Sequence, residues 1–353
     1  MTRTTIIKID HLGRGESYAS QAAGIIRSGG LVIIPTETVY GIAANMLDKK
    51  AIERLIRIKG RPQGKHFSLH IHKKETVDEL AKDIPVAAYK LMDRFWPGPL
   101  TLVFRSKDQG TIGMRMPDSE IAFKIIADSG VPVVCPSANI SGRPAPVNFQ
   151  DAIKGLSGLV DLAIDAGNTR IGVESSVVDV TQEPLRILRE GAIQKKDIEE
   201  TANKKTVLFI CTGNSCRSVM AEALLKKMLS ERNRSDVEVL SAGTMMNAGL
   251  PATEQTKEVL KRENIDVSGH ISRQVSREII NRSDIILVME KTHEGRVLEM
   301  APEARNRLFL LKEFAKINED GLDIEDPIGK SMEFYSNIFN TIKQALERII
   351  DII

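Results

Sequence analysis

A cysteine and an arginine with five residues between them form the most reactive pairing in this sequence. Cys211 follows the β-forming run 207–210, and Arg217 stands just before an apolar pattern at helical spacing over residues 218–228. A loop between a strand and a helix N-terminus can surround one anion with backbone N–H groups, and a guanidinium adds positive charge. We therefore expect Cys211 and Arg217 to bind phosphate or a mimic of phosphate.

The same positive field predicts how the thiol ionises. A free cysteine has a pKa of about 8.5, and a helix N-terminus with a neighbouring cation lowers it to about 3.5–7.5. We therefore expect Cys211 to be a thiolate at neutral pH. Its in-line attack on phosphorus would form a phosphocysteine, while Arg217 holds the equatorial oxygens. Asp326, which Pro327 follows, is the candidate acid for the leaving group.

Residues 205–353 resemble the low-molecular-weight protein tyrosine phosphatase family. The matching motifs are CTGNSCRS, SAGT at residues 241–244, residues 284–289 with His293, and Asp326-Pro327. The resemblance implies Cys211 as nucleophile, Arg217 as phosphate ligand and Asp326 as general acid. It also implies a supporting set in the phosphate loop: Thr212, Gly213, Asn214, Ser215, Cys216 and Ser218.

Two features bear on the phosphorylated substrate of this half. Family members that act on phosphotyrosine line their cleft with aromatic side chains, whereas residues 328–329 here are Ile-Gly and residues 245–247 are Met-Met-Asn. Ser215 stands where tyrosine-directed members have Ile or Leu, and with the DPIG sequence it is similar to the protein arginine phosphatase branch. We therefore favour protein phosphoarginine over phosphotyrosine as substrate.

Redox chemistry stays open as an alternative for the same loop. Arsenate reductases of this fold share CTGNSCRS, but they pass oxidation to two further cysteines, and this chain has none after Cys216. A reversible disulfide between Cys211 and Cys216 is a further hypothesis, because the two thiols are close in the sequence. Val219 replaces a proline usual in the family at the helix start, so the loop is expected to be slightly less rigid.

The first half of the chain carries a series of polar turns that follow apolar runs. PTETVYG at residues 35–41 follows the strand expected over residues 31–34, and the cationic KGRPQGK at 59–65 follows the helix expected over 49–58. A strand is expected over residues 67–72. The other turns lie in WPGPLTLVF, TIGMRMP, VVCPSANISG, VESSVVD and ILREG. Ligands bind at the carboxyl ends of strands in open α/β sheets, and a compact cationic loop suits a polyphosphate.

As a set, these motifs resemble the YrdC-like threonylcarbamoyl-AMP synthase family over residues 10–195. The resemblance implies condensation of L-threonine, bicarbonate and ATP to threonylcarbamoyl-adenylate and pyrophosphate, with Mg²⁺ bridging the phosphates. It also implies a downstream partner, the transferase complex that modifies tRNA. The implied ATP ligands are Lys59, Arg61, Lys65, Thr111, Ser137, Asn139 and Arg189. The implied threonine ligands are Thr38, His70, Arg115 and Ser175.

Two positions depart from this family's pattern, and two other interpretations remain. His66 replaces a usual proline and Ser176 a usual threonine, which predicts altered affinity rather than lost activity. His66, His70 and His72 alternate, but no cysteine joins them, and we expect no metal site. The alternatives for the first half of the chain are an RNA-binding module without catalysis and a carbamoyl-transfer domain of the hydrogenase-maturation type. The acylphosphatase and zinc-finger segments that accompany the second arrangement are absent.

Length and composition fit two domains in one chain. Of the 353 residues, 42% are hydrophobic and 27% charged, and the net charge of +2 gives no broad basic surface, so direct tRNA contact is not indicated. No membrane segment or secretory signal is visible, and three cysteines make no disulfide framework, so we expect the cytoplasm.

We expect a bifunctional α/β enzyme with two domains. Residues 1–195 would form a YrdC-like twisted mixed sheet, residues 196–204 a short, partly helical linker, and residues 205–353 a doubly wound parallel sheet. In the last of these, strands are expected over residues 237–240, 284–289 and 308–311, and helices over 252–263 and 331–352.

Overall fold

The computed structural model describes residues 3–9, 16–60, 67–245, 249–317 and 321–353. The chain divides into two compact units, Met1–Ala202 and Asn203–Ile353. Arg61, Lys65 and His66 lie outside the described residues. Within the described ranges, no helix combines the length and the apolar character needed to cross a membrane.

The first unit is built on a mixed sheet with the order β1-β9-β2-β3-β8-β4-β7-β6-β10-β11, and β5 pairs with β6. The strands are β1 (Thr5–Lys8), β2 (Val32–Pro35), β3 (Tyr40–Asn45), β4 (Leu69–His70), β5 (Ala81–Lys82), β6 (Leu100–Ser106), β7 (Thr111–Arg115), β8 (Val133–Val134), β9 (Leu162–Asp165), β10 (Ser176–Asp179) and β11 (Arg186–Arg189). The helices are α1 (Glu16–Arg27), α2 (Lys49–Lys59), α3 (Glu75–Leu80), α4 (Val86–Phe95), α5 (Glu120–Ser129), α6 (Phe149–Ile153) and α7 (Lys195–Asn203). The predicted mixed α/β sheet is confirmed.

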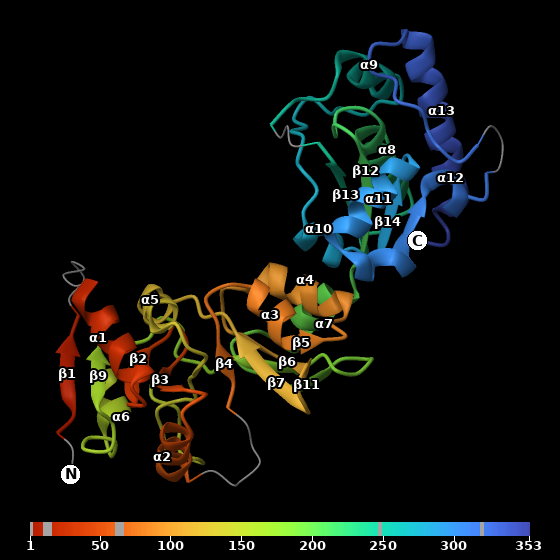
Figure 1. Cartoon of the computed structure of the whole chain (residues 1–353). Helices are drawn as coiled ribbons and strands as arrows, with labels where there is room; N and C mark the ends of the chain where they lie inside the picture. The colour runs from red at the N-terminus through yellow and green to blue at the C-terminus, as the bar shows by residue number, and fades with distance from the viewer. Residues whose placement is uncertain (1–2, 10–15, 61–66, 246–248, 318–320) are drawn as a thin grey trace. The chain divides into compact units, whose positions relative to one another are not determined.

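Helices cover both faces of this sheet near β2 and β3. Val32 and Ile34 of β2 pack with α1 and α5, whereas Leu31 and Ile33 pack with α2 and α6 (Figure 1). The alternation follows from the two-residue period of a strand. The loop between β2 and β3 carries the TET segment of the first motif, and α2 ends at Lys59, so both motifs project from these packed elements.

Two segments differ from the expected ones. Only Leu69 and His70 of the run 67–72 form a strand, because the strand pairing with β7 and β8 covers only those two residues. Most of the stretch expected as a linker forms α7, whose Ile198 and Ala202 are buried in the first unit's core. Because most residues of this stretch are charged or polar, its two buried apolar residues form no recognisable helical pattern.

The second unit has a four-stranded parallel sheet with the order β13-β12-β14-β15. Its strands are β12 (Lys205–Cys211), β13 (Val237–Gly243), β14 (Ile285–Val288) and β15 (Leu308–Leu310). Its helices are α8 (Arg217–Glu231), α9 (Glu254–Arg262), α10 (Arg277–Asn281), α11 (Lys291–Met300), the 3-10 helix η1 (Pro302–Arg307), α12 (Leu311–Phe314) and α13 (Met332–Ile349). Val207 and Phe209 of β12 pack with α8 and α13, while Leu208 and Ile210 pack with α10 and α11. The predicted doubly wound parallel sheet is confirmed.

Candidate functional site

The loop from Cys211 to Arg217 is closed by a chain of side-chain hydrogen bonds. The Sγ atom of Cys211 is buried and lies 3.0 Å from Oγ of Ser218. Asn214, with φ at +50°, donates from Nδ2 to Ser218 Oγ at 3.0 Å and to Ser241 Oγ at 2.7 Å. The arrangement leaves Ser218 able to donate its hydroxyl proton to a thiolate.

Gly243 of the SAGT motif allows its strand to approach this loop. A Cβ atom at Gly243 would lie 2.7 Å from the carbonyl oxygen of Thr212 and 2.9 Å from the backbone nitrogen of Asn214. Any other residue would push the loop away from β13. The position therefore needs glycine because of backbone proximity.

Arg217 is 1% exposed and is held by two carboxylates. Its Nη1 contacts the Glu290 carboxylate and donates to the carbonyl oxygen of Ile324 at 2.7 Å. Its Nη2 donates to Thr212 Oγ1 at 3.1 Å and to Asp326 Oδ2 at 2.5 Å. Its Nε is buried and has no hydrogen-bond partner among the described residues. The structure thus brings two of the three predicted catalytic side chains, Arg217 and Asp326, into contact.

Two residues of this site, Glu290 and His293, were not predicted from the sequence to have a functional role. Only Met289 separates Glu290 from the end of β14, so its place after a parallel strand was an available signal. His293 Nδ1 accepts from the backbone N–H of Glu290 at 3.1 Å, and its Nε2 lies 2.9 Å from Thr212 Oγ1. Burial and the Arg217 charge lower the pKa of His293 to about 4. The imidazole is therefore neutral at pH 7 and donates from Nε2 to Thr212.

The second cysteine of the loop has a different environment. Cys216 Sγ lies 3.4 Å from Thr253 Oγ1 and 3.6 Å from the Tyr335 hydroxyl. Burial raises the pKa of Tyr335 to about 12, so this hydroxyl keeps its proton. The cysteines are free thiols. Ser215 is buried beside Cys216, with its Oγ 3.7 Å from Sγ.

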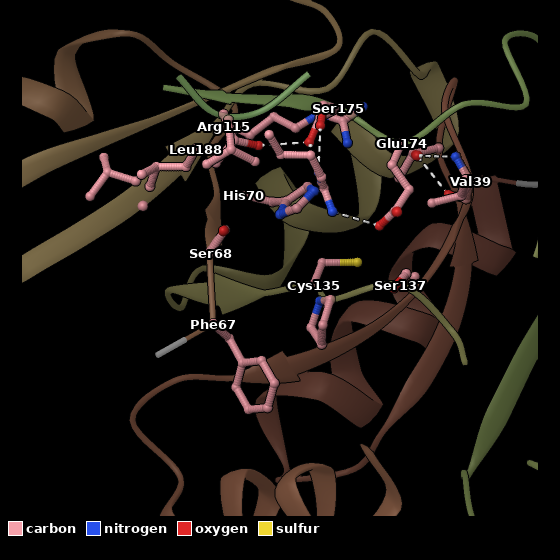
Figure 2. Close-up of a pocket in the computed structure, with 18 of the residues that line it drawn as sticks. Val39, Phe67, Ser68, His70, Arg115, Cys135, Ser137, Glu174, Ser175 and Leu188 are labelled. Atoms are coloured by element: carbon pink, nitrogen blue, oxygen red, sulfur yellow. Dashed lines mark hydrogen bonds and ion pairs between the residues drawn. The ribbon is translucent and has the colours of Figure 1, made fainter. Parts of the chain in front are cut away.

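The first unit contains a cavity of about 470 Å³ (Figure 2). It is bordered by the loop after β2, the end of α2, strands β4, β6 and β7, and the segments around β8, β10 and β11. Seven of the predicted ligands line it: Lys59, His70, Thr111, Arg115, Ser137, Ser175 and Arg189. Cys135 also lines it, and burial raises the pKa of this thiol to about 12, so it is neutral.

Asn139 and Thr38 belong to the predicted sets but do not line the cavity. Lys59 Nζ donates to the carbonyl oxygen of Ser137 at 2.6 Å and to Asn139 Oδ1 at 3.0 Å, so Asn139 contacts Lys59, which does line the cavity. Thr38 is fully buried, and its Oγ1 lies 2.9 Å from that of Thr36, which does line the cavity. The resemblance implied Thr38, whereas Thr36 is the threonine of this pair that lines the cavity.

Arg115 lies between a carboxylate and an imidazole. Its Nη2 donates to Glu37 Oε1 at 2.6 Å, and its Nε donates to the carbonyl oxygen of Gly98 at 3.2 Å. His70 is paired with Arg115 across β4 and β7. Burial and the Arg115 charge lower the pKa of His70 to about 3, so the ring is neutral. Glu37 was noted in the PTETVYG loop but was missed as a site residue.

Arg189 joins the two predicted ligand sets. Its Nη1 pairs with Glu174 Oε1 at 2.8 Å, and its Nη2 donates to Ser175 Oγ at 3.2 Å. Ser175 Oγ in turn lies 2.9 Å from Thr101 Oγ1. A residue expected on the ATP side and one expected on the threonine side are therefore in direct contact.

Comparisons with known proteins match a different family to each of the two units. Residues 24–191 match the Sua5/YciO/YrdC family model, described as telomere recombination, and residues 206–353 match the model for low molecular weight phosphotyrosine protein phosphatases. The chain belongs to both families. The Sua5/YrdC half is 45% identical over 212 residues to threonylcarbamoyl-AMP synthase of Pyrococcus abyssi. The matched region covers 58% of this chain and 62% of that protein. The chain therefore spans about three fifths of the length of that relative.

The phosphatase-family half is 35% identical over 140 residues to a Klebsiella pneumoniae member of the low molecular weight protein-tyrosine-phosphatases, covering 40% of this chain and 91% of that one. The crystal structure of P. abyssi Sua5 complexed with L-threonine matches with a TM-score of 0.54 and 26% identity over 98% of each chain. The predicted resemblances of the two halves are thus confirmed at the level of the family.

Two buried histidines, His70 in the first unit and His293 in the second, predict that the stability of each unit depends on pH. The pKa of His70 is about 3 and that of His293 about 4, whereas a histidine in the unfolded chain titrates at about 6.5. Above pH 6.5 neither state binds the proton. As the pH falls from about 6.5 to about 4, only the unfolded chain takes it up, so the free energy of unfolding decreases.

Urea unfolding at pH 7 and pH 5 measures this effect. His70→Gln and His293→Gln should each reduce the pH dependence of the unit that carries the substitution, and the decrease due to carboxylates should remain in both variants. A ring titration midpoint at about pH 6.5 in the folded protein, measured by NMR, would contradict the prediction.

Proposed function

We propose that the chain is a bifunctional enzyme. The Sua5/YrdC half would form threonylcarbamoyl-adenylate and pyrophosphate from L-threonine, bicarbonate and ATP. The phosphatase-family half would hydrolyse a phosphorylated protein through a phosphocysteine. The observation that supports the first activity is the cavity in which seven expected ligands meet. The observation that supports the second is the buried Arg217, whose Nε has no partner among the described residues.

In the synthase site, Lys59 and Arg189 would neutralise phosphate oxygens of ATP, and Arg115 would bind the carboxylate of threonine. The threonine amine attacks CO₂ and loses a proton, or attacks bicarbonate with loss of water, and a carbamate forms. The carbamate oxygen then bonds to the α-phosphorus of ATP, the bond between that phosphorus and the bridging oxygen breaks, and pyrophosphate leaves. This route needs no covalent enzyme intermediate, so the site acts by proximity and electrostatics. Arg61 and Lys65 remain proposed ATP ligands.

A magnesium ion brought with ATP would neutralise charge on the phosphate oxygens. Glu37 and Glu174, carboxylates at this site, are both ion-paired with arginines. We therefore expect the phosphates of ATP, rather than protein carboxylates, to hold the ion. The product would pass to the transferase complex that modifies tRNA, and the reducing conditions that a working thiolate needs favour the cytoplasm.

In the phosphatase site, the Cys211 sulfur would attack phosphorus. An S–P bond forms, the bond to the leaving atom breaks, and Asp326 gives its proton to that atom. Water then attacks the phosphocysteine, the P–S bond breaks, and Asp326 accepts the proton of the water. Arg217 would bind equatorial oxygens through Nε and Nη2, which requires Nη2 to release Asp326.

Phosphoarginine is the substrate that we favour for this site. Ser215 leaves room for a planar guanidinium beside the loop, and Met245 and Ile328 are exposed aliphatic side chains where an aromatic wall would hold phosphotyrosine. The experiment compares phosphoarginine and phosphotyrosine peptides as substrates, with Cys211→Ser as the blank. Preference for phosphotyrosine would overturn this assignment.

Ser215→Ile should reverse the preference. The larger side chain fills the space for the guanidinium, so we expect kcat/KM on phosphoarginine peptides to fall by about tenfold or more and that on phosphotyrosine to change by about threefold or less. Ser215→Thr, which keeps the hydroxyl, is the matched control and should stay close to the unmodified protein. Equal losses on both substrates in Ser215→Ile would mean that Ser215 does not select between them.

A further inference from the structure

Glu37 and Arg115 form a buried ion pair at the edge of the synthase cavity. Their side chains are 1% and 6% exposed, and the charged atoms lie 2.6 Å apart. Arg115 lines the cavity, whereas Glu37 does not. The carboxylate therefore contacts the arginine from the protein side and would not touch a ligand in the cavity.

Unpartnered polar atoms cluster around this pair. Five buried side-chain nitrogen or oxygen atoms have no hydrogen-bond partner within the described residues, and three of them are Glu37 Oε2 and the two ring nitrogens of His70. His70 is the cross-strand neighbour of Arg115. Because buried polar groups are nearly always hydrogen-bonded in folded proteins, the unpartnered ring nitrogens of His70, which lines the cavity, indicate a place that a ligand completes.

The contacts of Arg115 fix the orientation of its guanidinium. Nη2 is held by Glu37 and Nε by the carbonyl oxygen of Gly98, and Nη1 has no partner within the part of the chain that the structure describes. Glu37 is itself anchored, because its carbonyl oxygen accepts from the backbone N–H of Ile171 at 2.8 Å. A planar fork held at two of its three nitrogens presents the third in a defined direction.

We propose that Glu37 is a positioning residue, which orients Arg115 so that Nη1 binds the carboxylate of the amino-acid substrate. This inference rests on the proposed synthase function. Without Glu37, the buried guanidinium loses its counter-charge and one of its two fixed contacts. Its position would shift, and substrate carboxylate binding would weaken more than ATP binding.

The decisive variant is Glu37→Gln, which keeps the size of the side chain and removes its charge. We expect the KM and the calorimetric Kd for L-threonine to rise about ten- to a hundredfold, because a displacement of about 1 Å has effects of this order. The KM for ATP should change by about twofold or less. Glu37→Asp keeps the charge on a shorter side chain and should recover part of the threonine affinity.

Asp118→Asn is the matched control. Asp118 forms an ion pair with Arg170 on the surface of the same unit, with side chains 46% and 64% exposed. Such pairs contribute little to stability. This variant should bind threonine like the unmodified protein. The thermal unfolding of each variant shows whether the unit that carries the substitution is folded.

The outcomes separate the inference from the proposed function. If the unmodified protein binds threonine and Glu37→Gln binds it equally well, or weakens ATP and threonine alike, the positioning role is wrong while the function stands. If Glu37→Gln fails to fold, the threonine Kd of Glu37→Asp decides, and a value equal to that of the unmodified protein overturns the role. If the unmodified protein neither binds threonine nor releases pyrophosphate in its presence, the proposed function itself is wrong.

Discussion

Replacing Cys211 with serine is expected to lower phosphatase activity by more than about 10⁴-fold, because removal of a nucleophile costs this much or more in other enzymes. A serine hydroxyl is far less acidic than a thiol and is not an effective nucleophile in the same field. Ser218 Oγ lies 3.0 Å from the Cys211 sulfur, where its hydroxyl can donate to a thiolate. The synthase activity should be unchanged, because it belongs to the other unit.

The measurement is hydrolysis of a phosphopeptide, together with acid trapping of the phosphorylated protein and mass spectrometry. Cys135→Ser is the control, because it removes a buried thiol from the first unit and should leave phosphatase activity intact. Substantial hydrolysis by Cys211→Ser, or a phosphate trapped on another residue, would show that Cys211 is not the nucleophile.

Lys59→Met should lower kcat/KM for ATP in the synthase reaction by about 10²–10³-fold, the usual cost of removing one preorganised electrostatic contact to the reacting group. Methionine has a similar length but no charge. It cannot replace the donors that Lys59 Nζ offers to Ser137 and Asn139, so the loop after β8 loses these side-chain hydrogen bonds to α2. Phosphatase activity should be unaffected.

The readout is pyrophosphate released only when threonine, bicarbonate and ATP are all present. Lys50→Met is the matched control, because Lys50 lies on the same helix but is exposed. If Lys59→Met releases pyrophosphate as fast as Lys50→Met, the synthase reaction does not depend on a contact between Lys59 and the phosphates of ATP.

The parts of the structure that were predictable from sequence are those with local signals. The strand before Cys211 and the helix after it follow from β-forming residues and from apolar spacing, and both are present as β12 and α8. The burial of α7 was not predicted, because its buried apolar residues, Ile198 and Ala202, lie in a charged and polar stretch. Ile198 and Ala202 belong to a core cluster that also contains residues of α4 and β6, and no local pattern indicates this packing.

Site residues that depend on pairing between distant segments were harder to predict. Glu290 contacts Arg217 because β14 lies beside β12 in the sheet, although 73 residues separate the two side chains in the chain. Glu37 and Arg115 are likewise 78 residues apart. Motifs identified one member of each pair. The partner becomes visible only when strand order brings the segments together.

The contact between Arg217 and Asp326 has a consequence for the end of each catalytic cycle. Inorganic phosphate, once formed, would occupy the guanidinium nitrogen that Asp326 holds in the structure described here. The carboxylate competes with the product for the same donor, and each time Asp326 returns to Arg217 it promotes departure of the anion. The residue proposed to supply the proton would thereby also limit product inhibition, and its substitution should make inorganic phosphate a stronger inhibitor.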